Sequence, residues 1–182
     1  MIANVDKKFS ALRRRVRRAG LTLIEAAMVL VILALVIGGV MLYYNSASTG
    51  RQTSEAAGQL AAIQQAVRSM YAGQADYTGL SNTVIAQGLP NKMLFGGAAS
   101  GQLRHAFNNN VTVAPAGTGN QFTITFNGVP VEACMKLATQ DLGRGVTDLQ
   151  IGGTAGVQPR NPGDAQTQCG NAGSQTMVWT IF

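Results

Sequence analysis

Residues 21–44 read LTLIEAAMVLVILALVIGGVMLYY, and no other part of the chain constrains its architecture as strongly. From Ala26 to Leu42 this stretch carries no charged or strongly polar side chain. As an α-helix, residues 21–42 would extend about 33 Å at about 1.5 Å per residue, which is enough to cross the apolar core of a bilayer. We therefore predict that residues 21–44 form a membrane-spanning helix.

Basic residues gather immediately before this apolar stretch. Residues 1–20 hold seven of the 14 Lys and Arg side chains and one of the eight acidic ones, so the net charge of +6 belongs to that end. The positive-inside rule places residues 1–20 in the cytoplasm, and Tyr43 and Tyr44 would mark the far interface. Residues 45–182 would then face a bacterial periplasm. Because their basic and acidic side chains balance, we expect no nucleic-acid-binding surface on the mature chain.

Two details distinguish residues 19–25 from an ordinary secretion signal. A secretion signal is cleaved at small residues after its apolar run, but here the small pair Ala19-Gly20 precedes the run. Cleavage within YYNSASTGRQ, residues 43–52, remains an alternative. Glu25 is the one ionisable side chain of the span, and a carboxylate inside a membrane is a functional candidate. A simpler interpretation is that Glu25 reaches the lipid headgroups from the start of the helix.

The string GLTLIE, from Gly20 to Glu25, resembles the processing site of type IV prepilins. In that family a basic leader ends in Gly, a hydrophobic residue follows the cleaved bond, and Glu is the fifth mature residue. The 20-residue leader and Leu21 as the first mature residue indicate the type IVb branch. Over residues 18–80 the chain is similar to the bundle-forming and conjugative thin-pilus pilins.

The resemblance implies a sequence of events at the N-terminus. A membrane prepilin peptidase would cut between Gly20 and Leu21 and methylate the new amine of Leu21. Glu25 would then neutralise that amine while the subunit docks into a growing filament, because two opposite buried charges tolerate each other better than either alone. The precursor would sit in the inner membrane, and the product would be an extracellular homo-oligomeric filament built with a separate assembly machinery.

The implied function is that of a major type IVb pilin, which forms a filament for adhesion, cell aggregation or conjugative mating. A minor pilin or a type II secretion pseudopilin is the first alternative. The second is an unrelated periplasmic binding module or enzyme with a retained anchor. We expect no catalytic residues, metal site or cofactor, since His105 is the one histidine and the acidic residues lack metal-ligand spacing. A lone histidine of this kind is expected at the surface.

The predicted helix continues past the membrane to about residue 72. Ala56, Leu60, Ile63, Val67 and Met70 recur at spacings of four and three, as on the apolar side of an amphipathic helix. The polar residues expected elsewhere around this helix are Arg51, Gln59, Gln64 and Arg68. Within the membrane half, Gly38 and Gly39 indicate either a segment that bends or unwinds on assembly, or close helix packing through Ala34 and Gly38.

The remaining residues predict an antiparallel sheet, so the fold class is α+β: the pilin fold, with a long N-terminal helix packed on the sheet. We expect a leader at 1–20, a membrane or filament-core segment at 21–44, and a globular head at 45–182 that includes an amphipathic helix at 45–72. Residues 73–110 read as connecting loops with one short helix near 79–87, and residues 152–174 as a loop. Strands are expected at 111–113, 122–126 and 146–151, a helix at 131–142, and a buried terminal strand at 177–182.

Cys134 and Cys169 are the two cysteines of the chain. In an exported domain of this size they most often form a disulfide, and two buried free thiols are the alternative. Such a bridge would be worth roughly 3–4 kcal/mol by constraining the unfolded chain. By analogy with related pilins, residues 134–169 would be exposed on the filament and would contact neighbouring subunits.

Overall fold

The computed structural model describes residues 22–143, 145–170 and 173–182. The leader predicted for residues 1–20, with Gly20 and Leu21 at its cleavage site, lies outside the described residues. The chain divides into two compact units, Met1–Tyr43 and Tyr44–Phe182, and each is described by itself. The second unit is called the head below, and the described part of the first, residues 22–43, is called the apolar segment.

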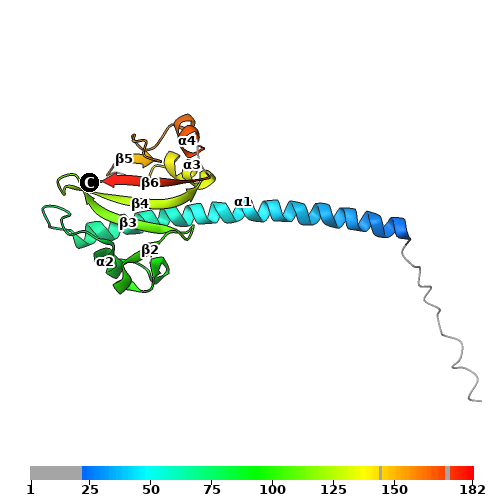
Figure 1. The fold of residues 1–182 in the computed structure, drawn as a ribbon, viewed down its shortest axis with the longest axis horizontal. Coiled ribbons are helices and arrows are strands. Elements are labelled where there is room, and N and C mark those ends of the chain that lie inside the picture. Colours follow the sequence, from blue (N-terminus) through cyan, green and yellow to red (C-terminus); the bar gives the residue numbers. More distant parts are fainter. Residues whose placement is uncertain (1–21, 144, 171–172) are drawn as a thin grey trace, which may run out of the picture. The chain divides into compact units, whose positions relative to one another are not determined.

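Helix α1 runs from Leu23 to Met70 without interruption, as predicted (Figure 1). In the head, the side chains of Ala56, Leu60, Ile63 and Val67 are fully buried, which confirms the apolar side expected from their spacing. Met70, the last residue of that pattern, is 37% exposed at the helix end. The buried side of α1 packs into one hydrophobic core with the sheet.

The head contains one antiparallel six-stranded sheet with the strand order β1-β2-β3-β4-β6-β5. Its central strands are β3 (Asn110–Ala116), β4 (Gln121–Pro130) and β6 (Ser174–Ile181), and β5 (Val146–Ile151) forms one edge. β6 lies between β4 and β5, so the prediction of a terminal strand inside the sheet is confirmed. Along β4 and β6, alternate side chains enter the core, among them Phe122, Phe126, Trp179 and Ile181.

The interpretation of residues 73–110 as loops with one short helix was incomplete. The helix is present as α2 (Asn82–Ile85), followed by the 3₁₀ turns η1 (Ala86–Gly88), η2 (Asn91–Met93) and η3 (Ala98–Ser100). Two strands were missed, β1 (Leu94–Phe95) and β2 (Gln102–Arg104), which extend the sheet at the β3 edge. With two and three residues, they are too short to show an alternating pattern.

The loop predicted at 152–174 was also wrong in part, because it contains helix α4 (Pro162–Cys169). The Asn161 side chain caps this helix by accepting a hydrogen bond of 3.0 Å from the N–H of Gly163, and Pro162 occupies the first turn. The Asn-Pro pair was therefore the local signal for a helix start. Helix α3 (Val131–Thr139) was predicted and ends three residues before the expected limit at 142.

Two polar residues that were expected at the surface are buried together. Gln59 is 5% exposed, and its Oε1 accepts a hydrogen bond of 2.8 Å from the N–H of Ala106. His105 is 3% exposed; its Nε2 lies 2.8 Å from the carbonyl oxygen of Asn127, and its Nδ1 accepts a bond of 3.2 Å from the N–H of Phe107. These partners select the neutral ring with the proton on Nε2, and burial lowers the pKa of His105.

Candidate assembly surfaces

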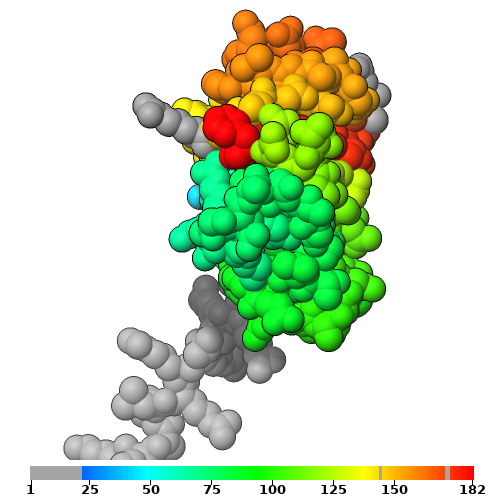
Figure 2. Space-filling view, turned by 90° about the vertical axis from the view of Figure 1, so that its left-hand side faces the viewer, coloured from blue at the N-terminus to red at the C-terminus, as the bar shows by residue number. Residues whose placement is uncertain are grey.

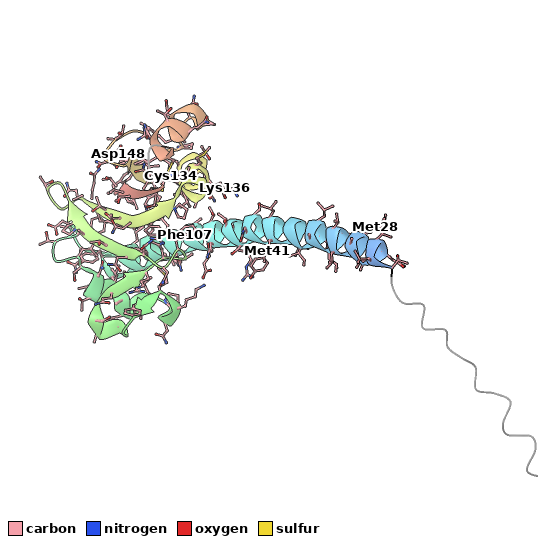
Figure 3. The ribbon with its side chains drawn as sticks, turned by 45° about the vertical axis from the view of Figure 1, so that its right-hand side comes forward. Met28, Met41, Phe107, Cys134, Lys136 and Asp148 are labelled. Carbon is pink, nitrogen blue, oxygen red and sulfur yellow. A yellow bond between two sulfur atoms is a disulfide. The ribbon has the colours of Figure 1, made fainter. Side chains whose placement is uncertain are left out.

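The apolar segment exposes almost every one of its large side chains. Met28, Leu35 and Leu42 are exposed by 60%, 72% and 75%, and an 18-residue window of α1 has a mean hydropathy of 2.7 with none of its residues buried. Figure 3 shows the Met28 and Met41 side chains standing out from the helix. Apolar exposure on this scale marks a membrane or protein contact surface. The length and composition of the helix are sufficient to cross a bilayer.

The start of α1 is capped by a residue that the sequence interpretation did not single out. The Thr22 carbonyl oxygen accepts a hydrogen bond of 3.0 Å from the N–H of Ala26, and its Oγ1 accepts one of 3.3 Å from the N–H of Glu25. The T-x-x-E spacing of these residues is the sequence signature of a capping box and could have identified Thr22. The cap places Glu25 in the first turn, where a carboxylate interacts favourably with the helix dipole.

Gly38 and Gly39 lie within α1, and apart from their chain neighbours and the adjacent helix backbone no described atom lies within 4 Å of a Cβ built on either residue. The folded chain therefore places no steric demand for glycine at these positions. A demand for glycine would have to come from a neighbouring helix that packs closely, or from bending of the segment. Both interpretations given above remain predictions.

A disulfide joins α3 to α4 in the head, as predicted. Cys134 and Cys169 are both fully buried, and their Cα atoms lie 5.9 Å apart. Figure 3 shows Cys134 on α3 beside Lys136. The two helices pack on each other, and their outer residues, including Lys136 and Asp164, are exposed. The bridge therefore fixes the α3–α4 surface without taking part in it.

A groove of about 610 Å³ separates this surface from α1 within the head. One wall consists of small residues on α1, and the other of the end of α3 and the loop after it. The α1 residues that line it are Gly50, Thr53, Ser54, Ala57, Gly58 and Ala61. Small side chains let a second helix approach the backbone closely, so the groove has the shape of a helix-packing surface.

Within the described residues, no three His, Cys, Asp or Glu side chains are grouped as a metal site would require. The predicted cleavage and methylation residues, Gly20 and Leu21, lie outside those residues. The described part of the chain therefore presents surfaces suited to contact with other molecules: the apolar segment, with Glu25 in its first turn, and the groove and α3–α4 surface of the head.

Comparisons with known proteins agree on one family. The family model described as Bundlin matches residues 45–181. The major structural subunit of the bundle-forming pilus of Escherichia coli O127:H6 (strain E2348/69 / EPEC) is 29% identical over an alignment 178 residues long, and the match covers 87% of this chain and 91% of that protein. The subunit of the same name from Escherichia coli O111:H- is 33% identical over an alignment 128 residues long, and this match covers 68% of this chain and 65% of that protein.

Among solved structures, TcpA, a type IV pilin from Vibrio cholerae El Tor biotype, superposes with a TM-score of 0.52. The match covers 72% of this chain and 99% of that one, at 15% sequence identity. At this identity the likeness concerns the fold alone, and it confirms the expected long helix on an antiparallel sheet.

Proposed function

Because this chain belongs to the bundlin family of type IVb pilins, we propose that it is the major structural subunit of an extracellular type IVb pilus. The observation that carries the proposal is the exposure of the apolar segment. Its large apolar side chains are exposed to solvent in a single chain, whereas the head buries its own in a hydrophobic core. Burial of apolar surface is the dominant favourable term in association, so copies of the chain would polymerise by covering one another's segments. The function is mechanical rather than enzymatic.

The precursor is proposed to be anchored in the bacterial inner membrane before assembly. The apolar segment would span the bilayer, with the basic leader in the cytoplasm and the head in the periplasm. A prepilin peptidase would remove residues 1–20 between Gly20 and Leu21 and methylate Leu21. While the leader is attached, Leu21 has no free amine and seven basic side chains accompany the segment, so the uncleaved chain cannot enter an apolar filament core.

Glu25 is proposed to pair with the Leu21 amine of its own or a neighbouring subunit. Its place in the capped first turn supports this role, because Thr22 holds the helix start at a defined residue. An unpaired carboxylate in the filament core would be strongly unfavourable, so a subunit that fails to make the pair would be excluded from the filament. An ATPase and a secretin supplied by other proteins would drive assembly and export.

The relatives named above are major subunits, which favours a major pilin over a minor pilin or a pseudopilin. The filament would support adhesion, aggregation or conjugative mating. A major subunit predicts that this chain is the most abundant protein in filaments sheared from whole cells. A trace amount, with another pilin in excess, would favour the minor-pilin alternative.

The deciding experiment is mass analysis of the N-terminus of protein sheared from whole cells. We expect a chain that begins at methylated Leu21 and is recovered in filaments. Glu25→Ala should then remove filaments while the cleaved protein persists in the membrane, and Glu55→Ala, which changes an exposed glutamate of the head, is the matched control. A chain that keeps Met1 and stays in the inner membrane would contradict the proposal.

A further inference from the structure

A polar pocket of about 270 Å³ lies on the head, apart from the groove and the α3–α4 surface. It is formed by α1, by the η2–β1 segment and by the turn after β2, and among the residues lining it are Glu55, Lys92, Phe95, Arg104 and Asn108. Figure 2 shows the segments around β1 and β2, in green, and those around α4, in orange, at opposite ends of one face of the head. The pocket shares no lining residue with the groove.

Arg104 is held in one position in this pocket. Its guanidinium carbon lies 3.7 Å from the ring centroid of Phe95, and its Nη1 donates a hydrogen bond of 3.1 Å to the Oδ1 of Asn108. On the opposite edge of the guanidinium, which Nε and Nη2 form, Nε is buried and has no hydrogen-bond partner within the described residues. That edge is the one that binds a carboxylate with two parallel hydrogen bonds. Because Nε is covered, a carboxylate reaches this edge through Nη2.

The other side chains of the pocket favour a ligand that has hydrogen-bond donors and an apolar face in addition to a negative charge. Lys92 Nζ lies 3.1 Å from Glu55 Oε1, and both side chains are largely exposed, so this pair is weak and available to a ligand. Glu55 accepts hydrogen bonds and repels a second negative charge placed beside it. Arg104 lies over one face of the Phe95 ring, and the ring, which is 50% exposed, offers the remainder of its surface as an apolar contact. A matching ligand carries one carboxylate, hydroxyl donors and an apolar face.

We propose that this pocket binds a sugar acid, such as a terminal sialic or uronic acid of a cell-surface glycan. The carboxylate pairs with Arg104 and Lys92, ring hydroxyls donate to Glu55, and the apolar face of the ring packs on Phe95. The biological meaning of this site rests on the proposed function, because a filament outside the cell meets such glycans. The binding itself does not depend on filament assembly.

Other anions fit the pocket less well. A phosphate or sulfate group places more negative charge near Glu55 and has no apolar face for Phe95. An acidic side chain from a second copy brings acceptors but no hydroxyl donors, so it repels Glu55 and offers it no hydrogen bond. The combination of Glu55 and Phe95 with Arg104 therefore selects the sugar acid over a bare anion.

The test is calorimetric titration of the full-length protein in detergent micelles with N-acetylneuraminic acid and with D-glucuronic acid. We expect saturable millimolar binding of at least one acid, and binding at least about tenfold weaker for its methyl ester, which keeps the ring and removes the charge. Sodium acetate and inorganic phosphate, which lack the ring, should bind at least about tenfold more weakly than the sugar acid.

Variants assign the binding to the pocket. Arg104→Gln and Arg104→Lys should each weaken binding about tenfold or more, the second because lysine lacks the planar fork. Lys136→Gln removes an exposed cation of α3 and should leave binding unchanged, and thermal unfolding confirms that each variant is folded. Equal binding of acid and ester, or unchanged binding by both Arg104 variants, would overturn the proposal. So would Arg104-dependent self-association without sugar binding, since this result would assign the pocket to an acidic side chain of a second copy.

Discussion

Two parts of helix α1 carry similar apolar side chains, which are buried in the head and exposed in the apolar segment. In the head, Leu60 and Ile63 are fully buried against the sheet, whereas in the apolar segment Leu35 and Ile37 are exposed by 72% and 56%. The head therefore has the contacts that it needs to fold within one chain. The segment gains its favourable free energy from lipid or from other copies. Stability of the head and assembly of the filament should consequently respond to different mutations.

The largest effect on the head alone should come from the disulfide. Replacing Cys134 and Cys169 together by Ser should lower the free energy of unfolding by about 3–4 kcal/mol, because the unfolded chain is no longer cross-linked. Denaturant unfolding of the oxidised protein and of the double variant measures the difference. If the variant unfolds at the same denaturant concentration, the α3–α4 contacts hold this region without the bridge.

Leu60→Ala and Leu35→Ala make the same chemical change in the two parts of α1. Leu60→Ala should destabilise the head by about 3 kcal/mol, because it leaves a cavity in a packed core. Leu35→Ala should leave head unfolding unchanged and reduce the yield of sheared filaments. Thermal unfolding in detergent and filament yield from cells measure the two outcomes. Equal destabilisation of the head by both variants would contradict the separation of roles.

His105 should make a smaller contribution, which is to the pH dependence of the stability of the head. Its pKa is lowered in the folded head by burial, so the unfolded chain binds the proton more readily than the folded one. Stability from this residue is thus complete above the unfolded pKa of about 6.5 and is lost as pH falls from there toward the lowered folded pKa. Thermal unfolding of wild type and His105→Gln between neutral and acidic pH should show a steeper acid loss in wild type. Parallel pH profiles for the two proteins would exclude His105 as the source.

The smallest effect should be local to the start of α1. Thr22→Val removes the side-chain acceptor for the Glu25 N–H and should weaken the first helical turn by about 1 kcal/mol. Amide hydrogen exchange in detergent micelles should show faster exchange at Glu25 and Ala26, with no change in the head. Thr22→Ser, which keeps the hydroxyl, is the control and should behave as wild type. A slowed exchange in Thr22→Val would argue against the cap.

Much of the fold and of the apolar segment could be predicted from local patterns. Three patterns, each visible within a few residues, predicted a structure: the uninterrupted apolar run, the spacing of Leu60, Ile63 and Val67, and the β-prone end of the chain. The pairing of Cys134 with Cys169 followed from their number, since two cysteines allow one bridge. The cap at Thr22 and the helix start at Asn161 were also present as local signals and were overlooked.

What the sequence determined by itself is the periodic part of the protein: a basic end, an apolar helix, and alternating strands whose hydrophobic faces require a shared core. Only the tertiary structure decided which isolated polar residues are buried and which are held in one position. His105 is buried because Asn127 and Phe107 satisfy its two nitrogens, and Arg104 is fixed because β1 brings Phe95 beneath it. Periodicity is a local property of the chain. The Asn127 carbonyl and the Phe95 ring belong to other strands of the sheet, so they reach His105 and Arg104 only once the strands have paired.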